Sequence, residues 1–414
     1  MVNVLMLGNG FDINYKLLTK YINFLNIVNH IAKTSPIDVK TVGDILKAEN
    51  LKFTDKDIAS SYQAYQQVYD NTQLEDGVLE KLSALANNNL LFSFLHKSFN
   101  RDVGWIDFER EIATVLRSFQ NFLPKLNTRF HGSNLPENPV DRHVLEMFGF
   151  FYMQTKKAEL TTGGRYIDAE YAINDEYIIE YPLGSGNKKI NDEEIVKALG
   201  KQLLELAEGL RIYLHCFVEK PFMQMCEGKL LHPMSALSHA EYIVTFNYTN
   251  TYELVYSAGK TFHIHGNTKD RIILGINPDE ADQLATINTL FVRFKKYFQR
   301  VIYHTDDEYL KWVIQKHANV SLVVMGHSLD VTDKDIIIQM FNMAKDITVL
   351  YYNENSEASL VTNLINIYGK EQFDELRIKK GLRFLPQNAS YNSFAEDRHA
   401  KEQAAIASMY RHLL

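Results

Sequence analysis

The spacing of the strand-like segments is the feature that most constrains how this chain can fold. A short apolar run at residues 2–7 ends at Gly8, and its length and valines predict a buried parallel strand. The next strand-like runs begin only near residue 242, and the pattern between them is mainly helical. Because a structureless loop of that length is improbable inside a compact domain, we expect a parallel sheet interrupted by a large helical insertion.

The second half of the chain alternates between strand-like and helical segments. Strands are expected at 242–246, 261–265, 271–274, 321–325, 347–352 and 382–385, helices at 280–302, 307–316 and 334–344, and a mainly helical tail beyond 356. Before residue 242, helices are expected at 11–28, 55–69, 78–99, 105–122, 142–156 and 192–218, with two short strands between 160 and 192. This alternation is typical of an α/β fold with a parallel sheet.

Composition excludes several classes of protein. The chain has 44 basic and 51 acidic residues and a net charge of −7, so it lacks the strongly basic character that signals nucleic-acid binding. Two cysteines, Cys216 and Cys226, are too few for a disulfide framework or a four-cysteine zinc set. The first residues resemble neither a signal peptide nor a membrane span. We therefore expect a cytoplasmic protein that makes no membrane contact.

A glycine-rich turn joins the first strand to the first helix. Gly8, Asn9 and Gly10 would let a ligand approach the backbone, and the following helix N-terminus attracts phosphate. The third glycine of the dinucleotide fingerprint is replaced by Ile13, so a plain strand-to-helix turn remains an alternative. Asp12 would stabilise the helix dipole but repel a phosphate, and it suits a ribose hydroxyl or a structural cap better.

Polar residues end the next two predicted strands. Asn247 lies at the carboxyl end of a strand, where a parallel sheet presents its ligands, although it could instead cap the next helix. His263 and His265 alternate along a strand and so share one face. They could form a metal pair, although no third ligand is evident. One of them, His265 beside Gly266, could instead be a general base with a near-neutral pKa, or both could be structural.

A third group follows the predicted strand at 321–325. Gly326, His327 and Ser328 resemble a nucleophile elbow of the form Gly-x-Ser-x-Gly, but the last position is Asp330. The same serine and backbone amides could hold a ribose or a phosphate. Asn353 ends the next strand-like run, where it could contact an adenosine ribose or simply form a turn.

Two acidic groups have competing interpretations. Asp330, Asp333 and Asp335 could be a metal cluster, but acids at a helix N-terminus explain them more simply. Asp107 and Glu109 lie in the predicted insertion. Because they are two residues apart, they cannot share one face of a helix. We expect no metal site.

Taken together, these motifs resemble the bacteriophage abortive-infection protein AbiH family. The matching segments are Gly8-Asn-Gly-Phe-Asp12 followed by Leu17, Thr19, Tyr21 and Phe24, then Trp105-x-Asp-Phe-Glu109, Thr245-Phe-Asn-Tyr248, His263-x-His-Gly266 and Gly326-His-Ser-Leu329. They are scattered over residues 1–353. The chain departs from the family's opening at residues 15–18, where a His-Gly-Leu-Pro-like segment is usual.

The family is similar in turn to sirtuin-like domains, which have a nucleotide-binding fold of Rossmann type. The resemblance implies a sirtuin-like Rossmann domain at 1–35 and 240–414 and a mainly helical inserted subdomain at 36–239. It implies a catalytic pair, Asn247 and His265, beside the nicotinamide ribose. It also implies cofactor contacts from Gly8, Asn9, Gly10, Phe11, Asp12, Thr245, Gly266, Gly326, His327, Ser328 and Asn353.

The function implied by this resemblance is anti-phage defence through NAD⁺ hydrolysis. The ribosyl–nicotinamide bond would be cleaved to nicotinamide and ADP-ribose, with NAD as the substrate and no metal. A non-catalytic sensor of NAD or ADP-ribose is the alternative, and a serine hydrolase using Ser328 is a remote one. The partner is a small-molecule nucleotide. A phage-derived trigger, a partner protein and homo-oligomerisation through the insertion stay open.

Overall fold

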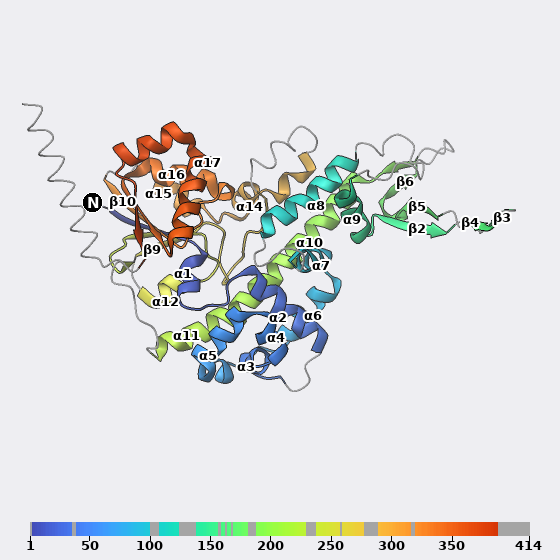
Figure 1. Ribbon diagram of the computed structural model, residues 1–414, viewed down its shortest axis with the longest axis horizontal. Helices are drawn as coiled ribbons and strands as arrows, with labels where there is room; N and C mark the ends of the chain where they lie inside the picture. The colour runs from blue at the N-terminus through green and yellow to red at the C-terminus, as the bar shows by residue number, and fades with distance from the viewer. Residues whose placement is uncertain are drawn as a thin grey trace, which may run out of the picture.

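The computed structural model describes most of the chain (Figure 1). The described residues are 2–34, 39–99, 107–123, 138–155, 159–161, 164–166, 169–180, 188–228, 237–256, 259–276, 289–315 and 319–387. Trp105, the first part of the predicted helix at 280–302 and the tail beyond 387 lie outside these ranges. Within the described ranges, no helix combines the length and apolarity needed to cross a bilayer.

Six parallel strands form one sheet in the order β12-β11-β10-β1-β8-β9. The bounds are β1 Val2–Leu7, β8 Tyr242–Thr245, β9 Lys260–His263, β10 Val320–Met325, β11 Ala344–Tyr351 and β12 Arg383–Pro386. The predicted Rossmann-like α/β fold with a parallel sheet is therefore confirmed. The strand predicted at 271–274 is not a sheet strand, because Ile272 makes only an isolated bridge to Gly266.

The first strand occupies the interior of this sheet. Leu7, the last residue of β1, is paired with Met325 of β10 on one side and Thr245 of β8 on the other. After β9 the chain crosses to β10 on the opposite side of β1, so the strand order reverses there. In open α/β sheets, ligands bind outside the carboxyl ends of the strands at such a reversal.

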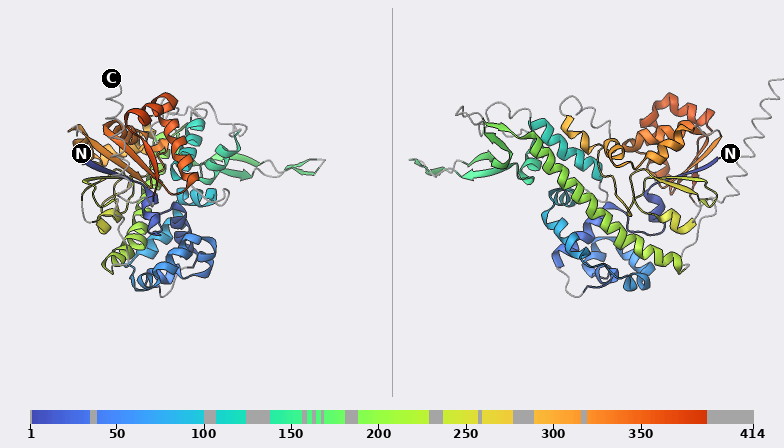
Figure 2. Two further views of the ribbon diagram at one scale, coloured as in Figure 1. Left: turned by 60° about the vertical axis from the view of Figure 1, so that its left-hand side comes forward. Right: turned by 180° about the vertical axis from the view of Figure 1, so that it is seen from behind.

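A helical insertion separates β1 from β8 in sequence. The helices from β1 onward are α1 Asn9–Asn14, α2 Tyr21–Thr34, α3 Val42–Leu46, α4 Glu49–Thr54, α5 Lys56–Asn71, α6 Val78–Asn88, α7 Leu90–Phe99, α8 Phe108–Phe122, α9 Pro139–Met147, α10 Asp192–Tyr213, a π-helix at Leu214–Glu219 and α11 Lys220–Glu227. Three antiparallel strand pairs, β2–β5, β3–β4 and β6–β7, extend away from the rest of the molecule (Figures 1 and 2). Their bounds are β2 Phe151–Thr155, β3 Glu159–Thr161, β4 Gly164–Tyr166, β5 Ala169–Ile173, β6 Ile178–Glu180 and β7 Lys188–Ile190.

The remaining helices follow β8 and its neighbours. They are α12 Thr251–Tyr256, α14 Lys296–Tyr303, α15 Asp307–Ile314, α16 Lys334–Met343 and α17 Glu354–Lys379, with short 3₁₀ turns at Thr289–Phe294 and Val331–Asp333.

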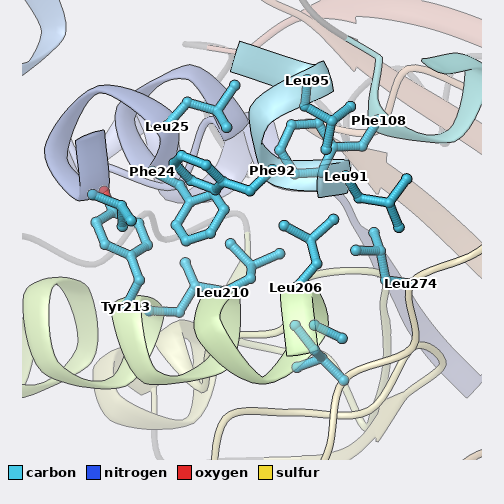
Figure 3. Packing of buried hydrophobic residues seen from close by; sticks show 14 of the residues in the cluster. Phe24, Leu25, Leu91, Phe92, Leu95, Phe108, Leu206, Leu210, Tyr213 and Leu274 are labelled. Carbon is cyan, nitrogen blue, oxygen red and sulfur yellow. The ribbon is translucent and has the colours of Figure 1, made fainter. Parts of the chain in front are cut away.

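The two faces of the sheet pack against different layers. Alternate residues of β1 face opposite sides, so Leu5 and Leu7 join one apolar cluster while Val4 and Met6 join the other. The cluster with Val4 and Met6 is closed by α15, α16 and α17. The other cluster continues into the insertion, where Figure 3 shows α2, α7 and α10 packed side by side. Each large apolar side chain that is fully buried contributes about 1.5–3 kcal/mol.

Three predicted helices are shorter in the structure than the sequence pattern predicts. The helix predicted at 11–28 stops at Asn14, where Lys16 has φ 57° and the chain turns Leu17 and Leu18 into the core. The helix predicted at 78–99 breaks at Asn89, whose amide donates to the carbonyl of Gln202. The helix predicted at 142–156 ends at Met147, and β2 follows.

Backbone contact between two loops explains the glycines after β1 and β10. The N–H of Gly8 donates to Met325 O at 3.1 Å, and that of Gly10 donates to Gly326 O at 2.8 Å. A Cβ added to Gly8 would lie 2.5 Å from the Cα of His327, and one added to Gly10 would lie 2.7 Å from the Cα of Gly326. Gly326 also has φ +69°. The loops can approach this closely only because these positions carry no side chain.

We predict that Gly8→Ala lowers the melting temperature by several degrees, because the added Cβ meets backbone that cannot yield. Overpacking of this kind costs about 1–3 kcal/mol. Gly200→Ala is the matched control: its Cβ would lie 3.6 Å from the nearest atom, inside α10. Alanine favours a helix interior by up to about 1 kcal/mol, so the control should hold or raise the melting temperature. Equal thermal melts for wild type and Gly8→Ala would contradict the contact.

Candidate functional site at the carboxyl edge of the sheet

Four loops meet at the carboxyl ends of the central strands. The loop after β1 contacts the loop after β10 through Gly8, Gly10 and Gly326, as described above. The ring of Phe246, directly after β8, lies against the rings of His265 and His327, with centroids 5.4 Å and 4.2 Å away. The structure therefore brings together predicted residues from β1, β8, β9 and β10.

Asp12 links the first loop to the loop after β8. It is buried, and its Oδ2 accepts a hydrogen bond from the Thr249 hydroxyl at 2.5 Å. Thr251 in turn donates to the hydroxyl of Thr249 at 3.0 Å. Burial raises the pKa of Asp12 to about 7, although hydrogen bonds from Thr249, Thr251 and Asn247 oppose the shift. The carboxyl is thus a connecting group in the interior rather than an exposed cap.

Asn247 is buried at the start of the loop after β8. Its N–H donates to the Thr245 hydroxyl at 3.1 Å, and its carbonyl lies 3.2 Å from Nδ1 of His263. The other ring nitrogen of His263, Nε2, is 2.8 Å from Glu253 Oε1. Both nitrogens of His263 are therefore engaged, which distinguishes it from His265.

A buried glutamate holds the same loop from the insertion. Glu219, the last residue of the π-helix, accepts hydrogen bonds from the N–H of Asn250 at 2.6 Å and from the hydroxyl of Thr268. Burial favours a raised pKa of Glu219, but the hydrogen bonds from His215, Thr268 and Asn250 prevail and lower it. The residue escaped the sequence reasoning because it belongs to no motif. π-Helical turns are often found at functional sites.

His265 lies in a buried cluster of charged groups. Its Nε2 is 2.9 Å from Asp333 Oδ1 and 3.4 Å from Lys296 Nζ, and Lys296 Nζ is 3.2 Å from the same carboxylate oxygen. Because an ionised carboxylate only accepts, Nε2 of His265 carries the proton and Nδ1 keeps its lone pair. Nδ1 is buried and has no hydrogen-bond partner among the described residues.

The electrostatics keep this histidine neutral. Burial lowers the pKa of His265 to about 4, and the charge of Lys296 acts in the same direction, against Asp333. The near-neutral pKa expected for a general base is therefore wrong. The pKa of Asp333 stays well below its usual range because Lys296, His265 and His327 outweigh the effect of burial. The cluster thus holds a neutral imidazole beside an ionised carboxylate.

His327 contributes to the cluster from the loop after β10. Its Nδ1 accepts the N–H of Leu329 at 2.9 Å, so its proton is on Nε2, which lies 3.4 Å from Asp333 Oδ2. Ser328 beside it is exposed, and its carbonyl accepts the amide of Asn363. Both ring nitrogens of His327 therefore face other partners, and neither is placed to act as a base for Ser328.

The remaining predicted residues lie around this centre. Asn9 is exposed beside the glycine contact, Phe11 is buried, and Gly266 with φ +74° allows the turn after His265. Asn353 caps α17 in a capping box with Ser356. Among the described residues, the hydrogen bonds of Asn353 go to Ser356 and not to His265 or Asn247. Its predicted contact with a ribose stays a prediction.

The insertion contributes a group that the sequence left unassigned. Asp107 caps the N-terminus of α8 by accepting the N–H groups of Glu109 and Arg110. Glu109 instead reaches Lys296 Nζ at 2.5 Å, so the two acids have separate roles. Burial raises the pKa of Glu109 to about 7, against the attraction of Lys296. One of its oxygens, Oε2, is buried without a hydrogen-bond partner among the residues described.

Lys296 was missed because α14 reverses the usual amphipathic pattern. The helix buries Lys296, Gln299 and Arg300 and exposes Tyr297 and Val301. Attraction from Asp333 and Glu109 outweighs the burial of Lys296 and raises its pKa. The sequence could have revealed Lys296 through this pattern, in which the apolar and charged residues of the helix exchange faces.

The three aspartates after β10 have different partners. Asp330 caps the following 3₁₀ turn, Asp333 belongs to the His265 cluster, and Asp335 pairs with Arg300. In the part of the chain that the structure describes, no group of three or more potential ligands could hold a metal ion.

The fold and the site define a Rossmann-like α/β protein with polar loops at its strand reversal. A family model described as bacteriophage abortive infection AbiH matches residues 4–352, so the chain belongs to this family. A search of curated proteins and a search of solved structures each found no match.

The buried carboxyl of Asp12 makes stability depend on pH. The pKa of Asp12 is about 7 in the folded protein, against a usual pKa of 3.8 in the unfolded chain. The stabilisation is therefore complete below pH 3.8, declines above that pH, and is lost as the pH rises through about 7. Above pH 7 the loss approaches ~4 kcal/mol.

We predict that Asp12→Asn raises the melting temperature, and by clearly more at pH 8 than at pH 5, where only part of the stabilisation has been lost. The amide stays neutral at both values and can still accept the hydrogen bond from Thr249. Thermal melts at the two pH values provide the measurement. A variant that is destabilised equally at pH 5 and pH 8 would show that the ionised carboxylate is required.

Proposed function

We propose that this abortive-infection protein acts by hydrolysing NAD⁺ to nicotinamide and ADP-ribose. The observation that carries the proposal is that Nδ1 of His265 has no hydrogen-bond partner among the described residues, while Asp333 holds the ring close to the loop of Asn247. Both residues follow adjacent strands at the edge where an α/β sheet binds its ligands. The membership in a phage-defence family is consistent with an activity that depletes a host metabolite.

In the proposed reaction, the bond between the ribose C1′ and the nicotinamide nitrogen breaks. The bonding electrons leave with nicotinamide, which becomes neutral, and positive charge develops on the ribose as in glycoside cleavage. Water then adds to C1′ and releases a proton. The balance is NAD⁺ plus water giving ADP-ribose, nicotinamide and a proton.

His265 would serve this reaction as a hydrogen-bond acceptor. Because its pKa is about 4, the ring is neutral at physiological pH and Nδ1 keeps its lone pair. A base this weak removes protons poorly in the ground state, but it can accept from a ribose hydroxyl or the attacking water as positive charge develops. Asn247 would orient the ribose. Such assistance contributes roughly 100- to 10,000-fold to a rate.

The adenosine diphosphate would lie along the contact between the two glycine loops. Gly8, Gly10 and Gly326 keep side chains out of the space between these two loops, so the backbone of both lies close to the proposed ligand. Their own N–H groups at positions 8 and 10 are already bonded to the β10 loop, so the donors to the phosphates must be other groups of these loops. Exposed Asn9 and Ser328 are the side chains placed beside the contact.

One observation favours a sensor as the second candidate. A neutral and weakly basic His265 suits binding of a ribose without turnover. A sensor would bind NAD and ADP-ribose with similar affinity and release no nicotinamide, whereas a hydrolase would release it.

We predict that purified protein releases nicotinamide from NAD⁺, and that His265→Gln reduces the rate at least ~100-fold. The glutamine amide can still donate to Asp333, but it removes the free acceptor at Nδ1. Asn247→Ala should cause a comparable loss. Chromatography of nicotinamide and ADP-ribose measures both, and thermal melts confirm that the variants are folded.

His263→Gln is the matched control, since His263 lies on the same strand end but both its ring nitrogens are already engaged, by the backbone carbonyl of Asn247 and by Glu253. It should retain most of the activity. Wild-type rates in both His265→Gln and Asn247→Ala would refute the assignment. If wild type binds NAD but releases nothing, even in phage-infected extract, the sensor is the correct function.

A further inference from the structure

The contact between Glu109 and Lys296 joins two distant parts of the chain at the candidate site. Glu109 is in the first turn of α8, within the insertion, and Lys296 is the first residue of α14. Their side chains are 14% and 4% exposed, and the Nζ to Oε1 distance is 2.5 Å. Water and salt screen an ion pair this deeply buried much less than they screen the ion pairs of a protein surface.

Lys296 uses the same ammonium group to approach His265. Its Nζ lies 3.4 Å from Nε2 of His265 and 3.2 Å from Oδ1 of Asp333. A positive charge at this distance disfavours a second positive charge on the imidazole. Glu109 is paired with the same ammonium and counters part of its charge.

We propose that Glu109 and Lys296 are positioning residues through which the helical insertion sets the protonation state of His265. The inference rests on the proposed function only in giving His265 its task. In this account, burial and the charge of Lys296 together keep the ring neutral, and Glu109 from the insertion allows the ammonium to stay buried beside it. The insertion is then part of the site, and displacement of α8 would change the protonation state of His265.

The charged groups around His265 have opposing effects. Lys296 and Arg300 of α14 disfavour the imidazolium, whereas Asp333 favours it. Glu109 faces Lys296, Asp333 and its own neighbour Asp107. The further titratable groups facing the cluster are His327, from the loop after β10, and Tyr248, from the loop after β8. Of these two cations, Lys296 has the larger effect on His265, so its removal should dominate.

The test is a titration of His265 in the full-length protein with ¹³C-labelled histidine, followed by NMR. The resonance missing from His265→Gln identifies the residue among the 14 histidines. Lys296→Met should raise the pKa of His265 by at least about one unit, because the nearest positive charge is removed. The double variant Lys296→Met/Glu109→Gln should titrate like Lys296→Met, because Glu109, whose pKa is raised to about 7, is already protonated where His265 titrates.

A second comparison covers the case in which Lys296→Met does not fold, since it leaves two buried carboxylates facing each other. The double variant loses one charge of each sign, and its His265 should still titrate about one unit above wild type. The matched control is Lys260→Met/Glu308→Gln. This removes an exposed ion pair, 3.0 Å apart, from β9 and α15, and should leave His265 unchanged.

Wild-type titration of His265 in the double variant would overturn the role of Lys296. A Glu109→Gln variant that melts at the wild-type temperature at pH 8, where Glu109 is ionised, would overturn the role of Glu109 as the partner that allows the ammonium of Lys296 to stay buried. Neither result depends on NAD, so the proposal can stand or fall separately from NAD hydrolysis. If NAD is hydrolysed, the pH dependence of kcat should move with the pKa of His265, which a merely structural ion pair would not cause.

Discussion

The buried ammonium group of Lys296 is the interaction on which the site depends. Removing a charge from water costs several kcal/mol, and the cost is offset only when partners are placed well. Here one partner, Asp333, comes from the Rossmann-like half, and the other, Glu109, comes from the insertion. The same ammonium disfavours a proton on His265. A single buried charge therefore links the packing of the insertion to the chemistry at the sheet edge.

The contact between the two glycine loops positions the polar groups at the carboxyl edge of the sheet. β1 is an interior strand, and its last residue is level with the ends of β8 and β10. Because Gly8, Gly10 and Gly326 bring two loops into backbone contact, the neighbouring polar groups are drawn over the same edge. Asp12 then reaches Thr249, and Glu219 holds Asn250 from the other side. The fold thus gathers residues that are more than 200 positions apart in sequence.

Sequence reasoning recovered the parts of this arrangement that follow local rules. Short apolar runs that end in glycine, asparagine or histidine identified the strands of the sheet and the polar residues that follow them, including Asn247 and His265. It failed where the cause is a contact between distant elements. Glu109, Lys296 and Asp333 meet only in the folded protein. The break in the helix at Asn89 depends on a partner in α10. The lowered pKa of His265 depends on burial and on the charge of Lys296.

The central claim is that the loops after β1, β8, β9 and β10 form one nucleotide-binding site. A crystal structure of the protein with ADP-ribose bound tests it most directly. The account predicts a ribose within hydrogen-bond distance of Asn247 and Nδ1 of His265, with the diphosphate over Gly8, Gly10 and Gly326. A nucleotide bound elsewhere, with Nδ1 of His265 still unpartnered, would contradict it.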